Sequence, residues 1–130
     1  MKRFSIRDGM GVERLRTLAG VEVGIISGED SAALRMRAQK LRITELYLGI
    51  KDKISVLDTI LEHHHLKAEQ VAYIGDDTND VDIMARVGLS ACPADATPFA
   101  KQVANYLCEH RGGGGAFREF AEFIIAARAL

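Results

Sequence analysis

The sequence predicts a doubly wound α/β fold built around a parallel sheet. Short apolar runs, rich in β-branched residues, alternate along the chain with amphipathic stretches of helical periodicity. Strands that alternate with crossover helices form parallel sheets. Ligands bind such sheets at the carboxyl ends of the strands, and the unusual polar residues of this sequence follow those ends. We therefore expect the functional site at that edge of the sheet.

The expected strands are short. They cover residues 21–26, 45–48 and 71–74, with weaker candidates at 2–6, 89–92 and 105–107. The expected helices carry apolar side chains at helical spacing. They cover residues 11–19, 30–41, 53–65, 81–87, 98–103 and 117–129. Gly20 and Gly88 follow two of these helices, as is usual at a helix C-terminus.

The composition is that of an ordinary globular protein. The 130 residues are 48% hydrophobic and 27% charged, with a net charge of −1, which excludes disorder, collagen and a strongly basic nucleic-acid binder. No apolar run approaches the roughly 20 residues that span a bilayer, and we see no secretion signal. Cys92 and Cys108 are too few for a disulfide scaffold and lack CxxC spacing. We expect a single cytoplasmic domain over residues 1–130, with neither a nucleic-acid nor a membrane partner.

An acidic cluster directly follows the strand at 71–74. Residues 75–80 read Gly-Asp-Asp-Thr-Asn-Asp, which places Asp76, Asp77 and Asp80 within five positions. Neighbouring carboxylates repel one another unless a cation neutralises them. Hard oxygen ligands of this kind suit Mg²⁺, which keeps several waters that a phosphate can replace. The alternative is a solvated turn in which Asp77 or Asp80 caps the next helix.

Two further polar residues lie at the boundaries of predicted elements, one after a strand and one at the start of a helix. Ser27 and Gly28 end the strand at 21–26, where a hydroxyl beside backbone N–H groups makes an anion pocket; the alternative is an ordinary N-cap. Lys53 opens a helix, where the helix dipole disfavours a cation, so the position indicates a nearby anion. Ordinary surface charge is the alternative for Lys53. Together the hydroxyl, the ammonium group and the acidic cluster match the needs of phosphoryl transfer.

Three other features favour structural interpretations. His63, His64 and His65 are consecutive, so they point around a helix in different directions and predict a solvated surface rather than a metal site. Cys92 and Cys108 are typical of small hydrophobic residues that line strands. The four glycines 112–115 fit either a flexible connector or a backbone that approaches a ligand closely.

Several of these segments resemble the haloacid dehalogenase-like phosphatases. The match is to the small, capless branch that contains 3-deoxy-manno-octulosonate 8-phosphate phosphatase and the phosphatases of nine-carbon sialic-type sugar acids. The segments that correspond to the second, third and fourth motifs of the family are residues 25–28, 52–53 and 73–80. Further matching segments are residues 2–4, 8–9, 37–41, 87–96 and 112–119. The resemblance implies a three-layer, Rossmann-like parallel sheet.

The resemblance also implies a reaction and the residues that perform it. The reaction is Mg²⁺-dependent hydrolysis of a 3-deoxy-2-keto sugar-acid phosphate, and the family is oligomeric, with tetramers. Ser27 would hold the transferring phosphoryl group and Lys53 would stabilise its charge. The Mg²⁺ site would consist of Asp76, with Asp77 and Asp80 acting directly on the ion or on its ligands. The substrate residues would be Gly28, Glu29, Gly114 and Arg118, and Glu29 favours a nine-carbon substrate.

One part of the family pattern is absent from the sequence. The first motif, Asp-x-Asp-Gly-x-x-Thr on the first and central strand, supplies the nucleophile and the general acid–base, and no segment before Ser27 matches it. We therefore expect a domain truncated at its N-terminus, which is inactive because it has no carboxylate nucleophile. The alternative is a catalytically silent ligand-binding or assembly domain that partners a sugar-nucleotide synthetase. Without the central strand, the sheet must close directly, borrow a strand such as residues 2–6, or be unstable.

Overall fold

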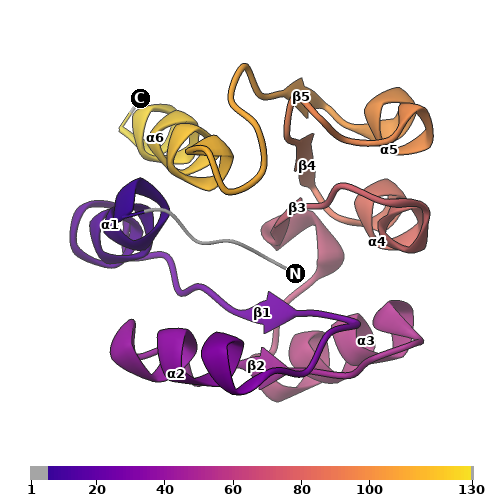
Figure 1. Ribbon diagram of the computed structural model, residues 1–130, viewed down its shortest axis with the longest axis horizontal. Helices are drawn as coiled ribbons and strands as arrows, with labels where there is room; N and C mark the ends of the chain where they lie inside the picture. The colour runs from indigo at the N-terminus through magenta and orange to yellow at the C-terminus, as the bar shows by residue number, and fades with distance from the viewer. Residues whose placement is uncertain (1–5, 130) are drawn as a thin grey trace. The chain divides into compact units, whose positions relative to one another are not determined.

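The computed structural model describes residues 6–129, which divide into two compact units (Figure 1). One unit comprises residues up to Lys51 together with those from Gly113 onward, and the other comprises residues 52–112. The five strands of the described residues are all parallel to their partners and form two sheets. The predicted α/β class with parallel pairing is therefore confirmed. Residues 2–5 of the strand expected at the N-terminus lie outside the described residues, and Ile6 begins a helix instead.

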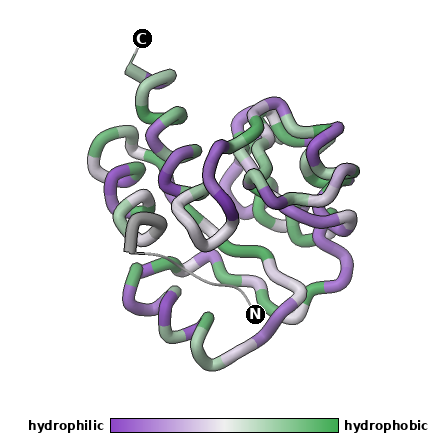
Figure 2. Tube along the Cα trace, turned by 45° about the horizontal axis from the view of Figure 1, so that its top comes forward, coloured by the Kyte–Doolittle hydropathy of each residue, from purple (hydrophilic) through white to green (hydrophobic). Residues whose placement is uncertain are grey.

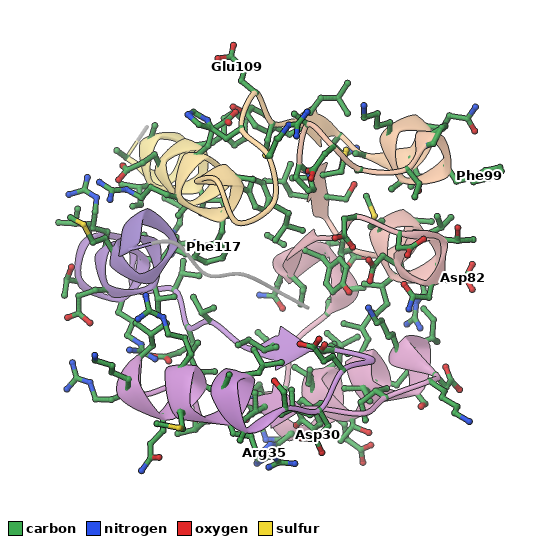
Figure 3. All side chains as sticks on the ribbon, in the orientation of Figure 1. Asp30, Arg35, Asp82, Phe99, Glu109 and Phe117 are labelled. Atoms are coloured by element: carbon green, nitrogen blue, oxygen red, sulfur yellow. The ribbon has the colours of Figure 1, made fainter. Side chains whose placement is uncertain are left out.

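The first unit contains a two-stranded sheet. Its strands are β1 (Ile25–Ile26) and β2 (Leu46–Tyr47), and its helices are α1 (Ile6–Arg14), α2 (Ala32–Lys40) and α6 (Ala116–Arg128), with a π-helix, η1, at Leu15–Ala19. A buried cluster of Val12, Ala38 and Ile43 forms its core, and Phe117 packs against this cluster from α6 (Figure 3). On the surface, Asp30 and Arg35 form a two-pronged ion pair at 2.8 and 2.9 Å.

The second unit contains a three-stranded sheet in the order β3-β4-β5. Its strands are β3 (Ala72–Ile74), β4 (Leu89–Cys92) and β5 (Tyr106–Leu107). Its helices are α3 (Lys53–His63), α4 (Val81–Arg86) and α5 (Pro98–Val103), with 3₁₀ turns η2 (Ala68–Gln70) and η3 (Thr78–Asp80). One buried core cluster of this unit contains Met84, Cys92, Ala96 and Ala100.

Side-chain hydrogen bonds to backbone N–H groups explain where α2, α3 and α5 begin. The hydroxyl of Ser31 accepts a hydrogen bond from the Leu34 N–H at 3.2 Å and starts α2. The carboxylate of Asp52 does the same for α3, and the hydroxyl of Thr97 does so for α5, which has Pro98 at its first position. Polar and apolar positions alternate along the helices, as the purple and green segments in Figure 2 show.

The N-terminal helix differs from the sequence prediction. A helix was expected over residues 11–19, but α1 begins at Ile6 and Leu15–Ala19 continue it as a π-helix. Gly9 and Gly11 lie inside α1, and glycine in a helix costs about 1 kcal/mol relative to alanine. Packing compensates for this cost, since a Cβ at Gly11 would lie 3.1 Å from the Phe117 ring, so the glycine lets α6 approach closely.

Several strands are shorter than predicted. Of residues 21–26 only Ile25 and Ile26 are in β1, although the ladder continues through the Ser27 N–H, which donates to the Tyr47 carbonyl at 2.9 Å. Among residues 6–129, β1 and β3 belong to different sheets, and how the sheet closes without the family's central strand stays a prediction. Within the same residues, no helix is long and apolar enough to cross a membrane.

Candidate functional site

The acidic turn begins where β3 ends. The Gly75 N–H still pairs with the Ala91 carbonyl at 3.0 Å, and the chain then turns into η3. Asp77 caps this turn, because its Oδ1 accepts a hydrogen bond from the Thr78 N–H at 2.6 Å. Asp76 and Asp77 are exposed, whereas only 3% of Asp80 is exposed. The three carboxylates therefore occupy two different environments.

The Asp80 carboxylate accepts hydrogen bonds on both oxygens. Its Oδ1 accepts from the Lys53 ammonium and from the Tyr73 hydroxyl, each at 2.6 Å. Its Oδ2 accepts from the backbone N–H groups of Asp76 at 3.0 Å and Asp77 at 3.2 Å. Because these four donors occupy the carboxylate, Asp80 has the geometry of a residue that orients the turn and Lys53 rather than of a direct metal ligand.

Lys53 is the first residue of α3 and is 6% exposed. The helix dipole makes this position unfavourable for a cation unless an anion lies nearby, and Asp80 supplies that anion. The pair is buried, so the attraction between the two charges is screened less than on the surface. The alternative of ordinary surface charge is therefore wrong for Lys53.

The electrostatics of the turn favour a divalent cation. Burial by itself raises the pKa of Asp80, but hydrogen bonds from Lys53 and Tyr73 outweigh burial and leave that pKa below its usual value. Lys53 and Asp80 neutralise each other, and the turn carries two further carboxylates, those of Asp76 and Asp77, both of them exposed. Exposed carboxylate oxygens are the donors that Mg²⁺ prefers, so these residues fit the ion.

The lowered pKa of Asp80 predicts a specific loss of stability in acid. A carboxyl group with a lower pKa in the folded state stabilises the fold above its unfolded value, here 3.8, and this stabilisation disappears as the pH falls further, through the folded pKa. We expect the free energy of unfolding, measured in urea, to decrease as the pH is lowered below 3.8. In Asp80→Asn this decrease should be shallower. An equally steep decrease in both proteins would assign the effect to other carboxylates, such as Asp30.

Ser27 lies in the first unit and is fully buried. Its hydroxyl oxygen accepts a hydrogen bond from the Glu29 N–H at 3.0 Å, and its carbonyl accepts one from the Ile50 N–H at 2.9 Å. Ser27 is not an N-cap, because α2 begins only at Ala32. Gly28 and Glu29 follow it in the same loop. Ser27 belongs to one unit, whereas Lys53 and Asp76 belong to the other. The convergence of these three residues in one crevice therefore stays a prediction.

The sugar-acid residues expected near the C-terminus also lie in the first unit. Arg118, in the first turns of α6, donates from its Nε to Glu122 at 2.9 Å. Glu122 also forms a two-pronged ion pair with Arg14 of α1, so one carboxylate lies between two guanidinium groups. Gly114 belongs to the turn at 112–115, in which Gly113 and Gly115 have φ values of 75° and 109° that favour glycine. The chain passes from one unit to the other at this turn.

Sequence reasoning missed Tyr73. The sequence analysis placed this residue in a strand and in the segment 73–80 but gave its hydroxyl no role, and in the structure the hydroxyl donates to Asp80. Burial raises the pKa of Tyr73 above its usual value, and the charge of Asp80 raises it further, so the hydroxyl stays protonated and donates. A tyrosine whose ring packs against a core usually needs a partner for its hydroxyl, and this requirement is the signal that could have revealed the contact.

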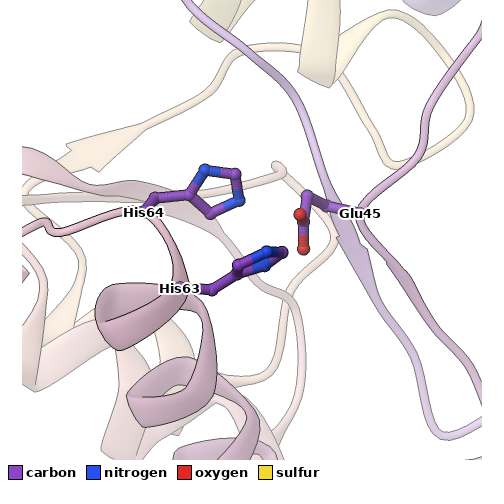
Figure 4. Close-up of side chains that lie close together, drawn as sticks. All are labelled: Glu45, His63 and His64. Atoms are coloured by element: carbon purple, nitrogen blue, oxygen red, sulfur yellow. The ribbon is translucent and has the colours of Figure 1, made fainter.

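The three histidines are exposed, as predicted for a solvated surface, but the rings of His63 and His64 lie side by side instead of pointing in different directions, and the two cysteines are buried, as predicted. His63, His64 and His65 are all exposed at the C-terminal end of α3, and the rings of His63 and His64 are tilted by 47° with centroids 4.8 Å apart (Figure 4). Cys92 and Cys108 are buried and form no disulfide. Burial raises the pKa of the Cys92 thiol, which opposes a nucleophilic role.

Comparison with known proteins gives a consistent set of relatives. A model of the haloacid dehalogenase-like hydrolases matches residues 27–119. The 3-deoxy-D-manno-octulosonate 8-phosphate phosphatase of Yersinia pestis is 42% identical over 128 residues, which make up 98% of this chain and 68% of the relative.

Two solved structures of such phosphatases superpose closely. The cobalt-bound deoxy-D-mannose-octulosonate 8-phosphate phosphatase of Haemophilus influenzae has a TM-score of 0.93 at 36% identity, over 99% of this chain and 75% of that one. The 3-deoxy-D-manno-octulosonate 8-phosphate phosphatase of Moraxella catarrhalis, solved with magnesium, phosphate and a KDO molecule, has a TM-score of 0.93 at 31% identity, over 98% and 72%. Both structures contain a divalent metal ion, which agrees with the donor set of Asp76 and Asp77.

Proposed function

Because the chain belongs to the haloacid dehalogenase-like hydrolase family, we propose that it provides the metal- and phosphate-binding residues of a sugar-acid phosphate phosphatase. The observation that carries the proposal is the buried Lys53–Asp80 pair, held at 2.6 Å beside an exposed acidic turn. A buried charge pair is costly to desolvate and adds little to stability in comparison with apolar residues. Its place at the end of β3 therefore supports a functional role.

Each of the proposed site residues has a distinct task. Asp76 and Asp77 would hold Mg²⁺, which supplies positive charge for the phosphate oxygens when it is bound. Asp80 orients Lys53 and the backbone of the turn. Lys53 would stabilise the charge of the phosphoryl group, and Ser27 would hold that group through its hydroxyl.

We propose 3-deoxy-D-manno-octulosonate 8-phosphate as the substrate. The names of the similar phosphatases from Yersinia pestis and Moraxella catarrhalis support an eight-carbon sugar acid. Glu29 favours a nine-carbon substrate instead, so both compounds belong in the assay. Gly28, Glu29, Gly114 and Arg118 remain the proposed substrate residues. A homo-oligomer, which light scattering of the purified chain would detect, also remains part of the proposal.

Two of the acidic residues that precede Ser27, Glu13 and Glu22, take part in ion pairs on the surface. Glu13 forms ion pairs with Arg16 at 4.0 Å and with Arg42 at 3.6 Å, and Glu22 lies 3.7 Å from Arg16. These carboxylates are exposed and belong to surface networks. We therefore propose that the polypeptide of residues 1–130, by itself, binds Mg²⁺ and phosphate but releases no phosphate from the substrate.

The proposal is tested by calorimetry and by an assay of phosphate release. The 130-residue polypeptide should bind Mg²⁺, and inorganic phosphate should bind only when Mg²⁺ is present. Asp76→Ala should weaken Mg²⁺ binding by at least about tenfold, since even outer partners of a metal contribute that much. Asp82→Ala, an exposed carboxylate on α4 that points away from the sheet in Figure 3, is the matched control and should change nothing.

The assay separates the competing functions. Neither the eight-carbon nor the nine-carbon substrate should release phosphate measurably. Robust turnover that Asp76→Ala abolishes would disprove the inactivity of this polypeptide while supporting the site. If Mg²⁺ and phosphate do not bind at all, the phosphatase proposal is wrong, and a silent assembly domain is the better description.

A further inference from the structure

We propose that Tyr73 is a positioning residue, whose hydroxyl fixes the Asp80 carboxylate between Lys53 and the acidic turn. The expected effect on Mg²⁺ rests on the proposed function, whereas the positioning itself rests only on the geometry of the second unit. No motif of the sequence assigned a role to this tyrosine.

The two oxygens of Asp80 have different kinds of partner. Oδ1 accepts from two side chains, Lys53 and Tyr73, each at 2.6 Å. Oδ2 accepts from two backbone groups, the N–H of Asp76 and the N–H of Asp77. The carboxylate keeps both sets of bonds only while its plane is held at one angle. Two donors on Oδ1 define that angle better than the flexible Lys53 side chain does alone.

The ring of Tyr73 makes the hydroxyl a rigid donor. Tyr73 packs against the buried cluster of Met84, Cys92, Ala96 and Ala100, so its ring is held by the core of the unit. A tyrosine side chain has few rotatable bonds, and its hydroxyl therefore has a nearly fixed position relative to β3. The turn that carries Asp76 and Asp77 is connected through Asp80 to this fixed point.

Removing the hydroxyl is expected to loosen the turn. In Tyr73→Phe the ring keeps its packing, but Oδ1 retains only Lys53 as a partner. The carboxylate can then rotate towards Lys53 and away from the two amides on Oδ2. These amides lose part of their protection, and the carboxylates that follow them are held less firmly for a metal ion.

The experiment compares Tyr73→Phe with a matched control, Tyr47→Phe. The Tyr47 hydroxyl also donates to a carboxylate, that of Glu45 at 2.7 Å, but it lies in the first unit. Amide hydrogen exchange by NMR should become about tenfold faster at Asp76 and Asp77 in Tyr73→Phe, which is the scale for a lost hydrogen bond to a charged group. The Cys108 amide, which bonds to the Cys92 carbonyl, should be unchanged. Mg²⁺ affinity should fall several-fold in Tyr73→Phe and stay constant in Tyr47→Phe.

The outcomes distinguish positioning from simple stabilisation. Unchanged exchange at Asp76 and Asp77 overturns the inference, and so does a uniform increase over the whole unit, which would show a general loss of stability. If the unmodified chain binds no Mg²⁺, the proposed function is wrong. The exchange rates of the Asp76 and Asp77 amides still show whether Tyr73 positions Asp80. If Tyr73→Phe does not fold, a measurement on the unmodified chain still tests the inference. The Tyr73 hydroxyl proton should be visible by NMR because the hydrogen bond slows its exchange with water, and its absence overturns the inference.

Discussion

Replacing Lys53 with methionine is expected to lower the free energy of unfolding by about 3–5 kcal/mol, because the Asp80 carboxylate would remain buried without its cation. Lys53 and Asp80 are 6% and 3% exposed, so water cannot take the place of the ammonium group without opening the unit. Urea unfolding followed by circular dichroism at neutral pH measures the change. Methionine is the appropriate replacement because it keeps most of the aliphatic length of lysine.

Two comparisons show whether the loss comes from the buried charge. Lys101→Met removes an exposed lysine from α5 and should change stability by no more than about 0.5 kcal/mol. The double variant Lys53→Met/Asp80→Asn removes both charges while keeping a carbonyl for the turn, and it should be more stable than Lys53→Met alone. If the two single changes simply add in the double variant, the residues are not coupled, and the buried pair is not the source of the loss.

The Lys53–Asp80 ion pair also affects how the proposed site would bind an anion. Lys53 is not an isolated cation, because Asp80 already neutralises it at 2.6 Å. In the proposed function, a phosphate that binds at the turn would lie near the exposed carboxylates of Asp76 and Asp77 as well as near Lys53. We infer that a bound divalent cation is needed to offset the repulsion between the phosphate and these carboxylates, which is why phosphate binding is expected to depend on Mg²⁺.

Local signals predicted the second unit better than the first. The strand at 89–92 and the helix at 98–103 have the observed bounds, since a glycine precedes the strand and Thr97 with Pro98 defines the start of the helix. In the first unit, packing overrides local preference. A helix containing Gly9 and Gly11 is poor by propensity, and α1 forms because its glycines admit side chains from neighbouring helices.

The candidate site was predicted as a set of residue types rather than as a network. Lys53 and Asp80 were both named from the sequence, but their pairing was not, because hydrogen bonds between residues 27 positions apart depend on the tertiary fold. Tyr73 was missed for another reason: it lies only seven positions from Asp80, but its need for a hydroxyl partner was not considered. The two interpretations of the acidic turn are also compatible, since Asp77 caps η3 while remaining exposed. A sequence pattern names candidate ligands, but it does not show which of them the chain uses internally.

Gly75→Ala is expected to destabilise the fold by about 2–3 kcal/mol and to weaken the site, because the added methyl group has no room. An alanine Cβ at this position would lie 2.6 Å from the Asp80 Cβ and 2.9 Å from the Tyr73 ring. The backbone of Gly75 also pairs with Ala91, so the strand cannot move away freely. Asp80 must therefore shift, which pulls its carboxylate away from Lys53. Urea unfolding and Mg²⁺ calorimetry measure the two effects.

Gly112, where a methyl group has room, provides the control for Gly75→Ala. In Gly112→Ala the new Cβ would lie 3.7 Å from its nearest neighbours, which is ordinary contact, so stability should change by less than about 1 kcal/mol. Combining Gly75→Ala with Tyr73→Phe gives a sharper test, because both changes act through Asp80. The effects of the two changes on Mg²⁺ affinity should then be less than additive. Full additivity of the two effects, or a Gly75→Ala protein as stable as Gly112→Ala, would mean that Asp80 does not pack against Gly75. The proposed hydrogen-bond network around the Asp80 carboxylate would then be wrong.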